Sequence, residues 1–349
     1  MTLDIRDHVP VSVDSSGAIV GAEPSLRALH RHFAALLPAS FDWSRCAAGP
    51  SLELSADSAD LPRLIDAEVV EGGALRAVRV SSPPEAGFVA FLDGTQTSRI
   101  VWYDGAMPIV HGTVAAVIRV RKNRRMATWR LHRASRIYAP RRLLGTAMND
   151  ALDALAPGVL VVDTTAADST DAPAGEHPFA VAEAARHFVQ RDREREEQEL
   201  AAQWCHVMAG PLFVDGGIGG SERTASRDCL VGVVKSHRTL YATGAALQAV
   251  LRLGAGERST VFRITSAKRR TTVASWYLRL RDSTGRDPMW GLVRVEMAEL
   301  RHATPAAITA RADEISRWVL AEVSPLALPD ARWDKMVYGV RDCEEVLRS

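Results

Sequence analysis

Short apolar runs separated by turn residues dominate the chain and predict strands. Gly87–Leu92 reads GFVAFL, which is too short for a helix, and it ends at Asp93-Gly94-Thr95. Arg99–Tyr103 follows, then the turn signal Asp104-Gly105, then the apolar run Ile109–Val120. Runs joined by such short turns are typical of antiparallel strands. We therefore expect a three-stranded meander in this region.

Helical and strand patterns alternate beyond this meander. Helices are expected over 141–155, 179–208, 243–253 and 305–323, and short strands over 212–214, 229–234, 261–265, 275–281 and 290–297. Three antiparallel strands, a helix and two further strands are the element order of a ribonuclease H-like core. We predict an α/β fold with a ribonuclease H-like mixed sheet flanked by helices. Residues 1–86 would form an N-terminal α+β extension, and the domain over 87–349 would end in a helical tail.

Composition places the chain among ordinary globular proteins. Of 349 residues, 47% are apolar and 24% are charged, which excludes a wholly disordered chain. No run of eighteen apolar residues is present, which argues against a membrane protein, and no secretory signal is visible. The four cysteines are far apart and show neither zinc spacing nor a disulfide framework; they are Cys46, Cys205, Cys229 and Cys343. This usage predicts a reducing, cytoplasmic location.

Positive charge is clustered although the formal net charge is only +1. Residues 119–142 carry ten Lys or Arg with Trp129 and Tyr138 among them. Such a run is typical of a nucleic-acid groove, and a solvated surface is the equally weighted alternative. The candidate nucleic-acid-binding residues are Arg121, Lys122, Arg124, Arg125, Lys268, Arg269 and Arg270.

Two aspartates follow unusually apolar runs. Asp93 comes after GFVAFL and Asp215 after PLFV, and a glycine follows each of them. A carboxylate at the end of a buried strand is a common ligand for Mg²⁺ or Mn²⁺. The alternative is that each Asp-Gly pair is only a turn. Because the pattern occurs twice, we retain both as candidate metal ligands.

A third carboxylate is expected from the long helix. Its middle, REREEQE, carries four glutamates sixteen to twenty-one residues before Asp215, namely Glu194, Glu196, Glu197 and Glu199. One of these can reach the aspartates, whereas each alone is more simply explained as a solvated residue paired with a neighbouring arginine. Lys235, at the end of CLVGVV, is a candidate for meeting phosphate or neutralising the carboxylates.

Taken in order, several short motifs resemble the NurA nuclease family. They are FLDGT at 91–95, the Arg/Glu-rich helix, LFVDG at 212–216, VGVVKS at 231–236, WYLRL at 276–280, VRVE at 293–296 and the tail from Asp330. The resemblance covers about residues 87–349. It implies a ribonuclease H-like, manganese-dependent nuclease acting on DNA. It also implies a homodimer that docks on the hexameric ATPase HerA.

The resemblance also assigns roles to residues. Asp93, Glu197 and Asp215 would hold Mn²⁺ or Mg²⁺, with Lys235 completing the catalytic set. Glu196 is the near alternative to Glu197, since the register of the helix is ambiguous. Many family members have a C-terminal histidine near the site, and this chain has no histidine after His302. Asp342, Glu344 or a three-carboxylate site are the alternatives.

These observations favour a metal-dependent DNA nuclease in end processing or phage defence. The alternative is a non-catalytic nucleic-acid-binding adaptor of the same fold that recruits an ATPase. A nucleotide-using enzyme is disfavoured, because the chain has no GxxxxGK[ST] and the glycine-rich segment 216–220 lacks the lysine.

Overall fold

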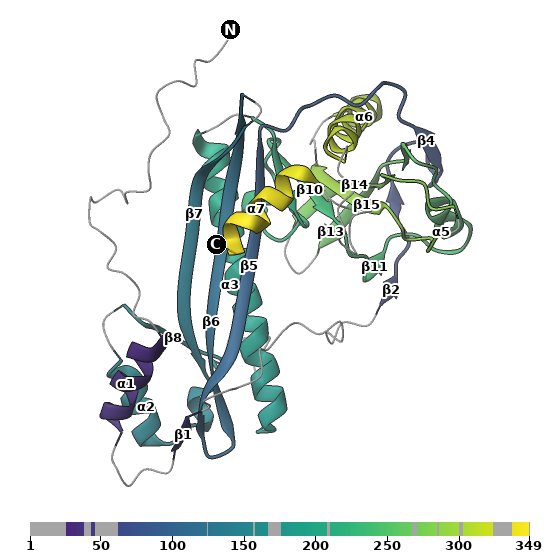
Figure 1. The fold of residues 1–349 in the computed structure, drawn as a ribbon. Coiled ribbons are helices and arrows are strands. Elements are labelled where there is room, and N and C mark those ends of the chain that lie inside the picture. The colour runs from purple at the N-terminus through teal and green to yellow at the C-terminus, as the bar shows by residue number, and fades with distance from the viewer. Residues whose placement is uncertain are drawn as a thin grey trace. The chain divides into compact units, whose positions relative to one another are not determined.

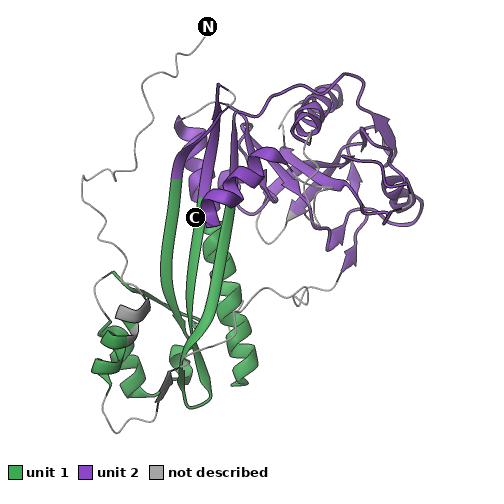
Figure 2. Ribbon diagram, in the orientation of Figure 1, with its two compact units in different colours: residues 1–58, 94–116, 131–196 green, residues 59–93, 117–130, 197–349 purple. Residues whose placement is uncertain are grey.

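The computed structural model divides into two compact units, shown in Figure 2. Unit 1 holds residues 1–58, 94–116 and 131–196, and unit 2 holds residues 59–93, 117–130 and 197–349. The structure describes residues 26–37, 43–45, 62–123, 125–155, 158–166, 176–207, 210–266, 271–284, 286–299, 303–323 and 337–348. Four long elements contribute residues to both units: β5 (Ala90–Asp104), β6 (Met107–Lys122), β7 (Arg125–Ala139) and α3 (Pro178–Val207).

Unit 1 packs helices on both faces of its strands. Phe33 of α1 (Leu26–Leu36) stacks on Trp102, and both join a core with Ile137 and with α2 (Thr146–Asp153). Val189 of α3 joins a second core with Tyr138. Consecutive strand residues point to opposite faces, so Ile137 and Tyr138 place these two cores on opposite sides of β7. The remaining elements of unit 1 are β1 (Trp43–Arg45), η1 (Arg141–Leu143) and β8 (Leu160–Asp163).

Unit 2 is built on a mixed sheet whose strand order is β3-β13-β14-β15-β10-β9-β5-β6-β7. Figure 1 labels β13, β14, β15, β10, β5, β6 and β7 of this order. The strands not yet given bounds are β2 (Arg63–Leu64), β3 (Glu68–Val69), β4 (Ala77–Arg79), β9 (Leu212–Asp215), β10 (Leu230–Val234), β11 (Thr239–Leu240), β12 (Glu257–Ser259), β13 (Phe262–Ser266), β14 (Thr271–Arg279) and β15 (Leu292–Ala298). The helices are α4 (Glu222–Ala225), α5 (Gly244–Leu251), α6 (Pro305–Glu322) and α7 (Tyr338–Arg348).

Strand direction in unit 2 confirms the expected fold. Strand β9 runs parallel to β5, and β10 runs parallel to β9. Only two residues separate β5 from β6 and β6 from β7, a spacing that only antiparallel neighbours can use. Three antiparallel strands, a helix and two strands parallel to the first are the ribonuclease H-like arrangement. Strands β3 and β4, from before residue 87, pair with β13 and β12.

Helices α6 and α7 cover one face of the sheet in unit 2. The indole of Trp276 on β14 donates a hydrogen bond to Ser316 of α6 at 3.0 Å. Trp318 of α6 packs edge-on against Phe88. Gly339 of α7 lies so close to Phe91 that a Cβ there would be 2.3 Å from the ring. The C-terminal helix is therefore pressed directly onto strand β5.

Two details of the expected meander are wrong. Asp93-Gly94 does not end a strand but lies inside β5, because the following threonines, glutamine and serine continue an extended backbone to Asp104. The third strand is not Ile109–Val120, which is the second, but β7. The arginines of β7 fall on both faces of the strand, so no period-two pattern marks it in the sequence.

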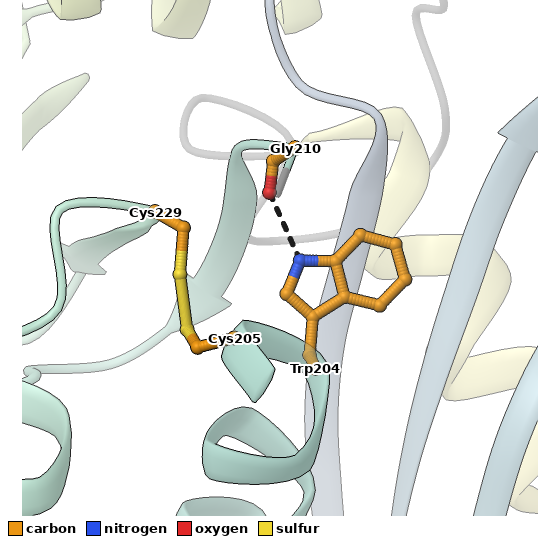
Figure 3. The surroundings of a disulfide bond; sticks show 4 residues. All are labelled: Trp204, Cys205, Gly210 and Cys229. Carbon is orange, nitrogen blue, oxygen red and sulfur yellow. Dashed lines mark hydrogen bonds between the residues drawn. A yellow bond between two sulfur atoms is a disulfide. The ribbon is translucent and has the colours of Figure 1, made fainter. Parts of the chain in front are cut away.

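The cysteine expectation is also wrong, because Cys205 and Cys229 form a disulfide (Figure 3). Cys205 lies in the last turn of α3, and the carbonyl oxygen of Cys229 accepts the amide of Leu212 at 2.8 Å. The bond thus ties the end of α3 to the start of β9 and β10. The pairing depends on packing between elements 24 residues apart, which spacing alone does not reveal. Cys343 is a buried free thiol.

Candidate active site: a carboxylate pair on adjacent strands

Asp93 and Asp215 occupy matching positions on neighbouring parallel strands of unit 2. Residues Ala90–Leu92 of β5 pair with Leu212–Val214 of β9, so the next residue on each strand is the aspartate. Parallel neighbours lie about 4.8 Å apart, and residues in register share a face of the sheet. The phenyl rings of Phe91 and Phe213, two positions earlier, meet at 5.8 Å on that face. The fold therefore brings the two predicted carboxylates together.

Lys235 joins this pair from the third parallel strand. Asp215 is in register with Val233 of β10, and Lys235 comes directly after the end of that strand. Its ammonium group lies 2.9 Å from the Oδ2 atom of Asp215. Both side chains are about one quarter exposed, so the pair is open to solvent. The cation offsets part of the negative charge that two aspartates in register create.

Asp93 lies on the face that helix α7 covers. Its side chain is nearly buried, and Phe91, on the same face, contacts Gly339. The thiol of Cys343 donates a hydrogen bond to the carbonyl oxygen of Phe91 at 3.4 Å. Burial raises the pKa of this thiol, and the neighbouring negative charge of Asp93 raises it further. Helix α7 is therefore a wall of the candidate site.

The glutamates of α3 divide between structural contacts and the remaining candidate. Glu196, in unit 1, lies 3.0 Å from Nη2 of Arg136 and 3.4 Å from Nδ1 of His132. The hydrogen bond from His132, followed by the interaction with Arg136, lowers the pKa of Glu196. Glu194 accepts a hydrogen bond from Gln190. Glu197 lies on α3 as expected, and its assignment as the third ligand remains a prediction.

The donor set fits a divalent cation only in part. Two aspartates in register offer the hard oxygen ligands that Mg²⁺ and Mn²⁺ prefer. Among the described residues, however, no group of three or more His, Cys, Asp or Glu side chains is arranged to hold a metal ion. Asp93 and Asp215 are thus neighbours on the sheet, and the part of Glu197 in binding a metal stays a prediction.

The basic run splits into paired and exposed residues. The guanidinium of Arg121 forms a two-pronged contact with the carboxylate of Glu322, at 2.8 and 2.5 Å, and lies over the ring of Phe91. The hydrogen bond to Glu322 raises the pKa of Arg121. Lys122 and Arg125, at the β6–β7 turn, are exposed. Arg124, Lys268, Arg269 and Arg270 lie outside the described residues.

The tail residues proposed in place of a histidine have partners of their own. Asp342 of α7 pairs with Nε of Arg119, whose Nη1 also donates to Thr128 at 2.5 Å. Glu344 pairs with Arg348 one turn along the same helix. A ligand role for Asp342 or Glu344 in place of a histidine stays a prediction.

Sequence reasoning missed the importance of Glu296 on β15. Its carboxylate is buried and accepts the amides of Ile218 and Gly219, in the loop that follows Asp215. The alternation of Arg294 and Glu296 in a strand was a visible signal. The contact of Glu296 with the glycine-rich loop was not, because it joins positions about eighty residues apart.

Comparisons with known proteins find similar solved structures, and two of them are described here. The NurA nuclease from Sulfolobus solfataricus is 11% identical, with a TM-score of 0.44, and the match covers 76% of this chain and 81% of that one. The catalytic domain of human Endonuclease V is 16% identical, with a TM-score of 0.29, over 93% and 97% of the two chains. No family model and no curated protein matches the sequence. In the part of the chain that the structure describes, no helix has the length and apolar character needed to cross a membrane.

Proposed function

We propose that this chain is a metal-dependent nuclease that hydrolyses phosphodiester bonds in DNA. The observation that carries the proposal is the pair Asp93 and Asp215, in register on parallel strands of a ribonuclease H-like sheet, with Lys235 beside Asp215. Like charges in register on adjacent strands repel, and Lys235 offsets this repulsion at Asp215. A divalent-metal site would use the negative charges of both Asp93 and Asp215, which explains why the fold places them together.

Asp93 and Asp215 would hold Mn²⁺ or Mg²⁺, with Glu197 the candidate for a third ligand. A bound ion of this kind stabilises the negative charge that builds on phosphodiester oxygens during cleavage. Lys235 holds the carboxylate of Asp215 in place and offers a cation that a phosphate at this site would meet. Lys122 and Arg125 would contact the DNA backbone without reading its sequence.

The test is degradation of linear DNA in Mn²⁺ by purified protein, with Asp93→Asn and Asp215→Asn as variants. We expect cleavage by the wild type and a loss of about 10²–10³-fold in each variant. Unchanged cleavage in either variant would exclude the two-carboxylate site. Cleavage that persists in excess chelator would exclude the divalent metal.

A second candidate is a non-catalytic DNA-binding adaptor that recruits an ATPase. It is favoured by the absence, among the described side chains, of an assembled three-ligand metal group. DNA binding without Mn²⁺-dependent cleavage would support the adaptor.

The resemblance to the NurA family supports a further proposal about assembly: a homodimer that acts with a HerA-type hexameric ATPase in DNA end processing or phage defence. A two-fold dimer on such a ring would let each site meet one emerging strand. Light scattering should then give about twice the monomer mass of 37.9 kDa. A monomer that neither stimulates nor is stimulated by a cognate ATPase would exclude the docking proposal and leave the metal site standing.

A further inference from the structure

We propose that Glu296 is a positioning residue for Asp215, acting through the glycine-rich loop that follows it. The inference rests on the proposed function, because it concerns one carboxylate of the candidate site. Glu296 acts on the backbone after Asp215 and not on the Asp215 carboxylate itself. It accepts the amides of Ile218 and Gly219, and so fixes the path of the backbone directly after Asp215.

The loop turns sharply at the residue after Asp215. Gly216 has a φ of +127°, a backbone conformation that side-chain-bearing residues rarely adopt. Its amide donates to the carbonyl oxygen of Val233, the residue in register with Asp215. The turn thus follows the end of β9 directly and is hydrogen-bonded to β10, so the loop is joined to Asp215 through Gly216 alone.

The loop then lies over Gly232. A Cβ at that position would be 2.7 Å from the carbonyl oxygen of Gly216 and 3.0 Å from the amide nitrogen of Ile218. Glu296 is the residue in register with Gly232 on the neighbouring strand β15. The missing side chain of Gly232 therefore makes the space in which the loop reaches the Glu296 carboxylate.

Glu296 closes this arrangement by accepting from three donors. Its Oε2 atom accepts the amide of Ile218 at 2.9 Å and the amide of Gly219 at 3.4 Å. Its Oε1 atom accepts Nη2 of Arg294 at 2.8 Å. The side chain of Glu296 is 5% exposed, so these bonds are shielded from water and the charged acceptor makes them strong.

The same contacts separate this loop from a phosphate-binding loop. In a phosphate loop the backbone amides point at the ligand. Here two of those amides are taken by a buried carboxylate of the protein itself. Gly216 allows the sharp turn, and Gly217 allows the loop to lie close to Glu296 on β15. We therefore assign the loop to positioning Asp215 and not to binding phosphate.

The test compares Glu296→Gln with the matched control Glu299→Gln. Glu299 is the next residue after β15, and its carboxylate accepts Nε of Arg263 at 2.6 Å, away from the loop. Three quantities are measured for each protein: amide hydrogen exchange at Ile218 and Gly219, the ¹³C shift of the Asp215 carboxylate, and Mn²⁺ binding by titration calorimetry alongside DNA cleavage.

We expect faster exchange and a moved Asp215 resonance in Glu296→Gln, with Mn²⁺ affinity or cleavage lowered about 10–100-fold, as for residues that orient metal ligands. Glu299→Gln should match the wild type. If Glu296→Gln does not fold, Arg294→Met leaves the carboxylate and its two amide bonds in place and should shift the same quantities less.

The outcomes distinguish the inference from the proposed function. An Asp215 resonance and a Mn²⁺ affinity that are unchanged in Glu296→Gln, despite faster loop exchange, would overturn the positioning role. A wild type that neither binds Mn²⁺ nor cleaves DNA would overturn the proposed function. In that case a moved Asp215 resonance would still support the positioning of Asp215 by Glu296.

Discussion

The polar cluster of unit 1 and the carboxylate pair of unit 2 use charge in opposite ways. In unit 1, Asp192 and Glu196 of α3 each meet cations or donors of β7: Asp192 accepts the hydroxyl of Tyr138 at 2.7 Å, and Arg136 contacts both carboxylates. Burial and the charge of Asp192 raise the pKa of Tyr138. Each negative group in this cluster has a positive or hydrogen-bonding partner facing it.

In unit 2, two negative groups are neighbours instead. Asp93 and Asp215 follow in-register residues on adjacent strands, and the cation Lys235 contacts Asp215. In unit 1 the cation Arg136 contacts both carboxylates, whereas in unit 2 the two aspartates lie side by side on adjacent strands, where like charges repel. The difference teaches that buried charge alone does not mark a functional site. Like charges held side by side are the more informative feature.

The strongest way to break this comparison is to neutralise the pair. Asp93→Asn removes a nearly buried charge beside another carboxylate, so the metal-free protein should keep its thermal midpoint or gain stability. Cleavage should fall by about 10²–10³-fold, the size of the effect when one group that stabilises developing charge is lost. Calorimetric melting in EDTA measures the first quantity. A clear loss of stability in Asp93→Asn would mean that Asp93 is a structural acceptor, and the contrast between the units would disappear.

The sequence revealed the core elements because their apolar runs are short and well punctuated. The runs that end in Asp215 and Lys235 lie on strands as expected, and the glutamates lie on a long helix. The extent of β5 could not be predicted, since Asp-Gly is a strong turn signal and only the pairing with β6 and β9 keeps it extended.

Contacts between distant residues were beyond the sequence. In the sequence, Arg121 is one cation of a basic run. In the structure its guanidinium forms a salt bridge with Glu322, about two hundred residues later. Two other contacts also join residues far apart in the sequence: the Cys205–Cys229 disulfide, and the hydrogen bond from the amide of Ile218 to Glu296. In each case the partner is set by tertiary packing, and no local pattern records it.

The α3 glutamates sharpen the comparison with a smaller effect. Glu196→Gln should lower the free energy of unfolding at neutral pH by about 1–3 kcal/mol, because it weakens a charged contact with Arg136 and His132. The folded pKa of Glu196 lies below its ordinary value, so this stabilisation is present above about pH 4.3 and is lost as the pH falls through the folded pKa. Denaturant titrations from pH 7 to pH 3 should show the wild type and variant converging.

Activity separates Glu196 from its neighbour Glu197. Per folded molecule, Glu196→Gln should cleave DNA as the wild type does, whereas Glu197→Gln should lose most activity. Glu194→Gln is the matched control, since Glu194 contacts Gln190 on its own helix. Loss of activity in Glu196→Gln with Glu197→Gln unaffected would move the third ligand by one residue. Full activity in a variant lacking both would remove the helix from the site.

The smallest expected effect concerns the basic turn of β6 and β7. Lys122 and Arg125 are exposed, so replacing both with alanine should weaken DNA binding and reduce the slope of log affinity against log salt by about 0.7–0.9 for each phosphate that the variant no longer neutralises. Arg121→Ala is the matched comparison, because its guanidinium is already held by Glu322, which is 4% exposed. That variant should lower stability and leave the slope near its wild-type value.

Binding to a labelled duplex at several salt concentrations measures the slope, and chemical denaturation measures stability. A slope that falls in Arg121→Ala but not in the double variant would show that Arg121 exchanges Glu322 for a phosphate when DNA binds, and would move the DNA-contacting surface from the turn to the face of β6 that carries Arg121.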